Sequence, residues 1–152
     1  MRCIAHINNG HGRQCKNHTN RGYYCYVHEE SIQHLQVKKS TIPNGGLGLF
    51  TTIDRKANKP IIPYEGKIIH QHNDHNNHYV LELANNKFID ASNPNSGVAR
   101  FSNTAKPRNR PIVNNAKYTK SRQRNSANIT AKKLIKKGKE ILVSYGRTFP
   151  IR

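Results

Sequence analysis

Three cysteines and one histidine near the start of the chain have the side chains of a metal site. Cys3, Cys15, Cys25 and His28 lie in a segment that is punctuated by Gly and Asn and has little apolar periodicity. Three thiolates and one imidazole complete a tetrahedral zinc shell, and zinc binding supplies folding free energy that so short and polar a segment lacks. The Cys25-x-x-His28 spacing lets two ligands reach one ion. We therefore predict a zinc-binding module over residues 1–30.

Other ligand sets are open from the spacing alone. The gap between Cys3 and Cys15 is long and less diagnostic, so His11 or His18 could replace one of the four ligands. The competing interpretation is three unconnected thiols, buried or free. A disulfide is not expected in an intracellular protein with an odd number of cysteines. The segment is also similar to a short cysteine-and-histidine module found in proteins of large DNA viruses and some eukaryotes.

A second histidine-rich stretch lies in the middle of the chain. Residues 70–78 contain four histidines and one aspartate, a density that can hold a transition metal. The stretch is also Asn-rich, of low complexity and without apolar residues, which favours a solvated loop. We therefore predict no second metal site.

Three further groups of polar and aromatic residues have types that suit a small ligand. The glycine-rich turn at residues 45–48 lets the backbone approach a ligand closely, although a glycine turn without a ligand is the commoner case. Asn103 offers both a donor and an acceptor, and its alternative role is an Asx-turn. Tyr145 ends an apolar segment, where a tyrosine usually packs in the core with its hydroxyl at the rim. The order of the three groups is a stronger signal than any one of them.

Short strands must position these groups. Alternation and β-branched residues predict strands, separated by turns, over residues 37–40, 48–52, 60–64, 79–83, 88–90, 127–131 and 141–145. Residues 29–36 have room for one or two helical turns, and we assign residues 31–36 to a linker. The expected fold class is β-rich, with several small sheets and short helices.

Length, composition and charge set the frame. A chain of 152 residues and 17.3 kDa is one domain with a small appendage. A hydrophobic fraction of 34% and a mean hydropathy of −0.85 imply a lean core. The 26 Lys+Arg against 8 Asp+Glu give a net charge of +18, which favours nucleic acid, chromatin or a packaged genome as partner, unless the charge only keeps the protein soluble. Without a membrane-length apolar run or an apolar signal segment, we expect an intracellular protein.

Several ordered motifs together resemble those of the SET-domain protein lysine methyltransferases, in particular compact SET proteins of large DNA viruses and eukaryotes. After the glycine turn, residues 100–105 (Arg-Phe-Ser-Asn-Thr-Ala) resemble the family's Arg-Phe-x-Asn-His-Ser block. Residues 114–118 are similar to its Asn-Ala-x-aromatic strand, and residues 137–146 to its Gly-Glu-Glu-hydrophobic and Tyr-Gly ending. The resemblance covers residues 37–149, with a SET domain expected over 37–147 and a short tail over 148–152.

The resemblance implies a SET-type fold with a C-terminal pseudoknot and a binding site for S-adenosylmethionine. The implied cofactor-binding residues are Gly46, Leu47, Gly48, Tyr79, Arg100, Asn103, Thr104, Tyr145 and Phe149. Tyr145 is the implied catalytic residue, with Tyr64 and Tyr118 as walls of the substrate channel and Tyr79 on the cofactor or peptide face.

The sequence departs from the family pattern at identifiable places. Thr104 and Ala105 do not match the family's residues after Asn103, and extra residues lie between Asn103 and Asn115. The family's zinc-binding cysteines after the last strand are missing, and we expect Phe149 to close the cofactor pocket as an aromatic lid instead.

The implied reaction is methyl transfer to a lysine, which must be neutral although its free pKa is about 10.4. Desolvation in an aromatic channel lowers that pKa, and Tyr145 would orient the amine. The expected substrate is a histone or a DNA-packaging protein in the nucleus or on chromatin, of the host cell if the protein is viral. Basic segments at 106–110, 117–124 and 132–137 are expected to dock on DNA or nucleosomes. The oligomeric state is open, and a homodimer is one possibility.

The rival hypothesis belongs to a different class. It is a basic zinc protein with a SET fold that binds nucleic acid or chromatin and no longer catalyses. Thr104 and Ala105 favour this rival, whereas Tyr145, Asn103 and the glycine turn favour the enzyme.

Overall fold

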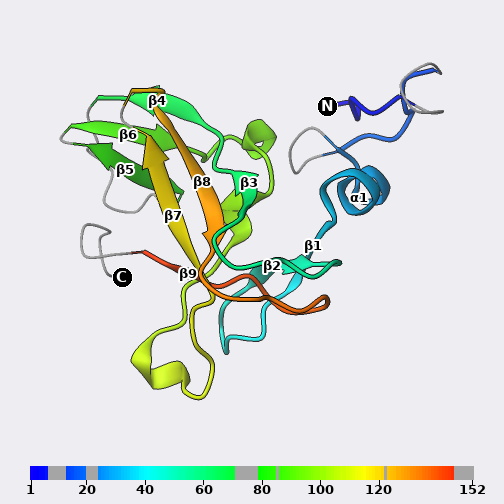
Figure 1. Cartoon of the computed structure of the whole chain (residues 1–152). Helices are drawn as coiled ribbons and strands as arrows, with labels where there is room; N and C mark the ends of the chain where they lie inside the picture. The colour runs from blue at the N-terminus through cyan, green and yellow to red at the C-terminus, as the bar shows by residue number, and fades with distance from the viewer. Residues whose placement is uncertain (7–12, 20–23, 71–78, 85, 122, 146–152) are drawn as a thin grey trace.

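The computed structural model describes residues 1–6, 13–19, 24–70, 79–84, 86–121 and 123–145 (Figure 1). Its elements in chain order are α1 (Tyr26–His28), the π-helical turn η1 (Glu29–Gln33), β1 (Leu35–Lys39), β2 (Leu47–Thr51), β3 (Pro60–Pro63), β4 (Lys67–Ile69), β5 (Val80–Ala84), β6 (Lys87–Asp90), the short 3-10 turns η2 (Pro94–Ser96), η3 (Ala99–Phe101) and η4 (Pro107–Asn109), β7 (Ala116–Ser121), β8 (Ser126–Ala131) and β9 (Val143–Ser144).

Three small sheets make up the larger part of the molecule, as Figure 1 shows. One sheet pairs β1 with β2, the second has the order β3-β8-β7-β9, and the third has the order β4-β6-β5. All pairs are antiparallel except β7 with β9, which run parallel. The expectation of a β-rich fold built from several small sheets with short helices is confirmed.

Strands appear close to the predicted positions. The alternation pattern misses β4 and β7, although the resemblance implies a strand at residues 114–118, which overlaps β7. β4 has only three residues, too few for a visible alternation. β7 has the polar sequence Ala-Lys-Tyr-Thr-Lys-Ser and is a strand because β8 and β9 pair with it on both sides. β1 begins at Leu35, inside the range assigned to a linker, and the Leu35 side chain is fully buried.

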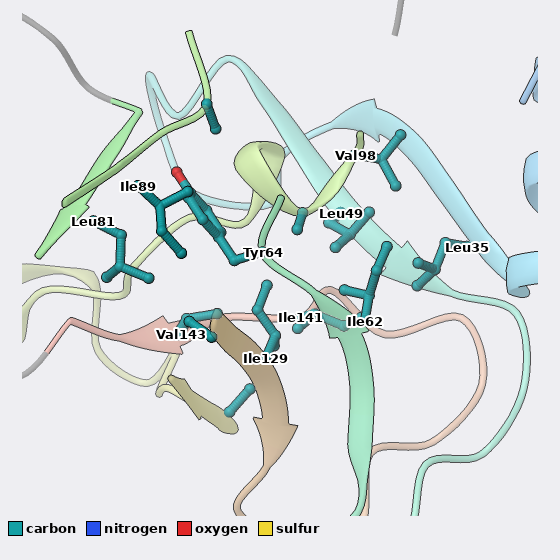
Figure 2. Packing of buried hydrophobic residues seen from close by; sticks show 14 of the residues in the cluster. Leu35, Leu49, Ile62, Tyr64, Leu81, Ile89, Val98, Ile129, Ile141 and Val143 are labelled. Carbon is teal, nitrogen blue, oxygen red and sulfur yellow. The ribbon is translucent and has the colours of Figure 1, made fainter. Parts of the chain in front are cut away.

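The core lies where the three sheets meet. Leu49, Ile129 and Ile141 have no exposed surface, and they come from β2, β8 and the segment before β9. Figure 2 shows these side chains grouped with Ile62 and Val143. Because this one cluster receives side chains from every sheet, it fixes the sheets relative to one another.

The segment 140–143 connects parts of the chain that are far apart in sequence. Glu140 forms an antiparallel bridge with Phe50 in β2, and Leu142 forms a parallel bridge with Asn103. Val143 then pairs with Ala116 in β7. The final strand therefore lies between the Asn103 segment and β7, which is the C-terminal pseudoknot that the resemblance implies.

The cysteine-rich segment forms a separate unit beside the sheets, on the side of α1 in Figure 1. Isolated bridges join Arg2 to His18 and His6 to Gln14. Its buried cluster consists of Cys3, Ala5, Cys15 and Cys25, with Tyr24 packed against them. The described part of the chain contains no helix long and apolar enough to span a membrane.

Candidate active site and metal cluster

The glycine turn approaches a buried carboxylate at the start of β2. Gly46 has φ of +63°, a left-handed conformation that favours glycine. At Gly48, an added Cβ would lie 2.2 Å from Oε1 of Glu140, a position that no side chain can share. Glycine is therefore favoured at these positions for two different reasons: the left-handed backbone at Gly46, and the closeness of the Glu140 carboxylate at Gly48, which an added Cβ would displace.

Asn103 joins this turn to the end of the chain. Its Nδ2 donates to the Leu47 carbonyl at 2.9 Å and to Oε1 of Glu140 at 3.4 Å. Its backbone carbonyl accepts from the N–H of Val143 at 2.8 Å. The structure thus brings the predicted residues Gly46, Leu47, Gly48 and Asn103 together. The donor of the Asn103 amide is used inside the protein, which leaves Oδ1 as the group that can face a ligand.

Three further residues hold this site and were not predicted from the sequence. Glu140 links the turn to Asn103, as above. Asn114 accepts from the Ala105 N–H at 2.7 Å and donates to the Ala105 carbonyl at 3.1 Å. Asn115 donates to the Glu140 carbonyl and accepts from the Leu142 N–H, both at 2.9 Å. The Asn114-Asn115 pair was a signal, because adjacent amides can hold two backbone segments at once.

Thr104 and Ala105 depart from the family pattern, and the structure shows how their block is held. Thr104 is half-buried. On one side of it, the Asn103 carbonyl accepts a hydrogen bond from the Val143 N–H. On the other side, the Asn114 side chain bonds to both the N–H and the carbonyl of Ala105. Backbone anchors on both sides therefore hold this segment in place.

Three tyrosines form a continuous aromatic group next to Asn103. The rings of Tyr64 and Tyr118 meet edge to face at 5.6 Å, and those of Tyr118 and Tyr145 stack at 6.0 Å. The Tyr145 hydroxyl donates to the carbonyl of Ser102 at 3.3 Å, one residue before Asn103. The predicted channel residues are thus in contact with one another and are tied to the segment that holds the glycine turn.

Burial keeps these hydroxyls protonated. Burial raises the pKa of Tyr145 to about 12, with a smaller contribution from Tyr79. Burial likewise raises the pKa of Tyr64 and of Tyr118. At neutral pH the group is therefore a set of neutral phenols, which can donate and accept hydrogen bonds without adding a negative charge.

Tyr79 and Arg100 lie together at the other end of the tyrosine group. Tyr64 donates its hydroxyl proton to the Tyr79 carbonyl at 3.0 Å, and the Arg100 guanidinium lies 4.5 Å from the Tyr79 ring centre. Arg100 also donates to the carbonyls of Ala91 and Ser92, both at 3.0 Å. These bonds tie Arg100 to the chain after β6 and to Tyr79. Phe149 lies outside the described residues.

The four predicted metal ligands converge in the N-terminal unit. The Sγ atoms of Cys3 and Cys25 lie 3.5 Å and 3.3 Å from Nδ1 of His28, and the Sγ atoms of Cys15 and Cys25 are 4.0 Å apart. All four ligand atoms lie within 4.8 Å of one another. Tetrahedral zinc would place two sulfurs about 3.8 Å apart and a sulfur about 3.5 Å from a nitrogen, so the cluster fits a zinc ion.

The two histidines that were alternative ligands, His11 and His18, are not part of the cluster that the structure describes. His18 is exposed and pairs with Arg2, and it is not in the cluster. His11 lies outside the described residues, as do residues 71–78 of the histidine-rich stretch. Burial opposes ionisation of Cys25, but the His28 backbone N–H, the Asn17 amide and the His28 ring outweigh it and lower the pKa of the Cys25 thiol to about 6. A thiolate of that kind is the form that binds a metal.

Comparison with known proteins gives the same fold. Residues 46–146 match the SET domain family. The methyltransferase domain of human PR domain-containing protein 2 superposes with a TM-score of 0.61 at 21% identity, covering 78% of this chain and 81% of that one. A structure described as ctPRC2 in an autoinhibited conformation bound to S-adenosylmethionine superposes with a TM-score of 0.60 at 22% identity, covering 77% of this chain and 16% of that one. No curated protein matches the sequence.

Proposed function

Because the chain belongs to the SET-domain family, we propose that it is an S-adenosylmethionine-dependent protein lysine N-methyltransferase. One observation supports this most directly. The Tyr145 hydroxyl bonds to the Ser102 carbonyl, and Asn103, the next residue, bonds to the glycine turn. The tyrosine group, which would bind the amine, and the glycine turn, which would bind the cofactor, are therefore both attached to the segment of Ser102 and Asn103.

The chain's own residues have defined parts in this proposal. Gly46, Leu47, Gly48 and Asn103 would hold S-adenosylmethionine, which supplies a methyl group on a sulfonium sulfur. Oδ1 of Asn103 is an acceptor suited to an ammonium group. The neutral phenols of the tyrosine group would desolvate a lysine side chain, which lowers its pKa and frees the nitrogen lone pair. Tyr145 would orient that nitrogen.

We further propose a histone or DNA-packaging protein as substrate, methylated on chromatin. The supporting observation is charge: 26 Lys+Arg against 8 Asp+Glu. A loop at residues 105–114, here called the basic arm, contains Lys106, Arg108 and Arg110 and no acidic residue. The arm extends away from the sheets as the yellow-green loop in Figure 1. Such a surface suits phosphate groups of DNA beside the substrate.

For the N-terminal unit we propose one structural zinc ion held by Cys3, Cys15, Cys25 and His28. The distances above support this, as does the composition of the unit's buried cluster, which is mostly the cysteines themselves. The zinc would hold the unit together and would not take part in methyl transfer.

Transfer of a labelled methyl group to histones or to total cell protein tests the enzyme function. We expect the wild type to transfer and Tyr145→Phe to lose about 100-fold in rate, because only the orienting hydroxyl is removed. Binding of S-adenosylmethionine, measured by calorimetry, should persist in Tyr145→Phe. A wild type that binds DNA tightly but neither binds the cofactor nor transfers methyl would instead support the non-catalytic rival.

A further inference from the structure

Glu140 is a buried carboxylate that bonds to two separate parts of the cofactor site. The residue is 5% exposed. Oε1 accepts from the Ser40 hydroxyl at 2.7 Å and from Asn103 Nδ2 at 3.4 Å. Oε2 accepts from the Thr41 N–H at 2.8 Å and from the Thr41 hydroxyl. From its position three residues before β9, the carboxylate thus connects the chain just before the glycine turn with Asn103, the residue that bonds to Leu47.

All these donors are neutral groups. Among the described residues, no Lys, Arg or His forms an ion pair with Glu140. A buried carboxylate is costly unless its oxygens are hydrogen-bonded, and an apolar side chain would be the simpler filler for a core position. The presence of a carboxylate at this buried position is therefore better explained by the two chain segments that it connects than by a gain in stability.

The glycine turn fits against this carboxylate closely. Gly48 leaves no room for a Cβ beside Oε1, and Ser40 and Thr41 hold the carboxylate from the other side of the turn. Asn103 meets the same oxygen that Ser40 meets. A displacement of Glu140 would release the turn and Asn103 together.

We propose that Glu140 is a positioning residue of the cofactor site, which fixes the glycine turn and Asn103 in one relative arrangement before the cofactor binds. This role in cofactor binding rests on the proposed function. Glu140 does not itself need to touch the cofactor. It acts through Leu47, Gly48 and Asn103, whose backbone and side-chain groups face the ligand in that proposal.

The test is Glu140→Gln, which keeps the size but replaces one acceptor oxygen with a donor. An amide cannot accept from Thr41 on one side and from Ser40 and Asn103 on the other. In the protein without cofactor, we expect at least tenfold faster hydrogen exchange at the amides of residues 41, 46–49 and 103–105, with exchange in β7 and β8 unchanged. Calorimetry should show S-adenosylmethionine bound about tenfold more weakly.

Two further variants make the result specific. Asp54→Asn is the matched control. Like Glu140, Asp54 accepts a hydrogen bond from a backbone N–H, that of Lys137 at 2.8 Å, but the Asp54 side chain is exposed. It should leave both measurements as in the wild type. Thr41→Val removes one hydroxyl donor and keeps the N–H, so it should shift exchange in the same direction by less, even if Glu140→Gln fails to fold.

Unchanged exchange of both segments in Glu140→Gln and Thr41→Val would overturn the proposal. If the wild type binds no S-adenosylmethionine, the proposed function fails, while the exchange experiment still decides whether Glu140 holds the two segments together.

Discussion

The rings of Tyr64, Tyr118 and Tyr145 come from three distant parts of the sequence and contact one another in one group, in which Tyr64 is buried and the other two are half-buried. Because burial raises the pKa of each, ionising any of them inside the folded protein is unfavourable. In the proposed function, protonated tyrosines suit a lysine substrate, since a tyrosinate would attract the ammonium form and disfavour the neutral amine.

The same shift predicts how stability depends on pH. The pKa of Tyr145 rises from 10.0 to about 12 on folding, so the folded state holds its proton more tightly than the unfolded state. This stabilising contribution is complete below pH 10.0 and is lost as the pH rises towards about 12. Tyrosinate absorbance and circular dichroism followed together should show the buried tyrosines ionising as the fold is lost. Ionisation of all tyrosines near pH 10.0 with the fold intact would contradict it.

Single residues could be placed from the sequence where the residue type is rare and has few alternative roles. The Cys25-x-x-His28 spacing and the Asn103 and Tyr145 motifs gave the positions that the structure places in the metal cluster and beside the glycine turn. Glu140 was not predicted, because a carboxylate in an apolar strand shows its partners only once Ser40 and Thr41, about a hundred positions earlier, are placed beside it.

The N-terminal unit and the sheets differ in what holds them. In the unit, the buried cluster is three cysteines and Ala5, whereas the sheets share a core of leucine, isoleucine and valine. Without a metal, the unit therefore has little apolar surface to bury, and its folding should depend on the ion. The sheets have an apolar core of their own, so their folding should not depend on the ion.

Metal removal should separate these two elements. We expect about one zinc per chain, and a chelator should abolish hydrogen-exchange protection of the amides of Cys3 and Cys15, which bond to Asn17 and Ala5. Protection in β7 and β8 should persist, and Cys25→Ala should copy the chelator. Purified protein without zinc, or a chelator that leaves the two amides protected, would refute the metal proposal.

Among the strands, those with apolar alternation could be predicted and those formed by pairing could not. β5 and β8 are visible in the sequence, because their alternate residues are buried hydrophobics. β7 is lysine-rich and becomes a strand by lying between β8 and β9, and the latter contact depends on the pseudoknot. The parallel pairing is a property of the assembled chain, and local sequence contains no trace of it.

Over the whole molecule, the net charge of +18 predicts salt-dependent binding to DNA. The basic arm is closed at its base by Asn114 and Ala105, which makes it a defined surface. Replacing Lys106, Arg108 and Arg110 by Gln should lower the slope of log affinity against log salt concentration by about 3.

A triple change of the exposed Lys56, Lys59 and Lys67, which removes the same charge outside the basic segments, is the control and should lower the slope less. Titration of duplex DNA at several salt concentrations measures both slopes. Equal slopes for the two triple variants would mean that net charge, and not the arm, determines binding.

The position of residues 142–143 between Asn103 and Ala116 has a consequence during synthesis of the protein. On the ribosome, the glycine turn, Asn103, Tyr64 and Tyr118 are all synthesised before residues 140–145, yet they acquire their shared geometry with Tyr145 only when that last segment has been inserted. A nascent chain would therefore be unable to use its cofactor until residues 140–145 are made. A chain that stops before residue 140 would therefore lack the assembled site and would be inert.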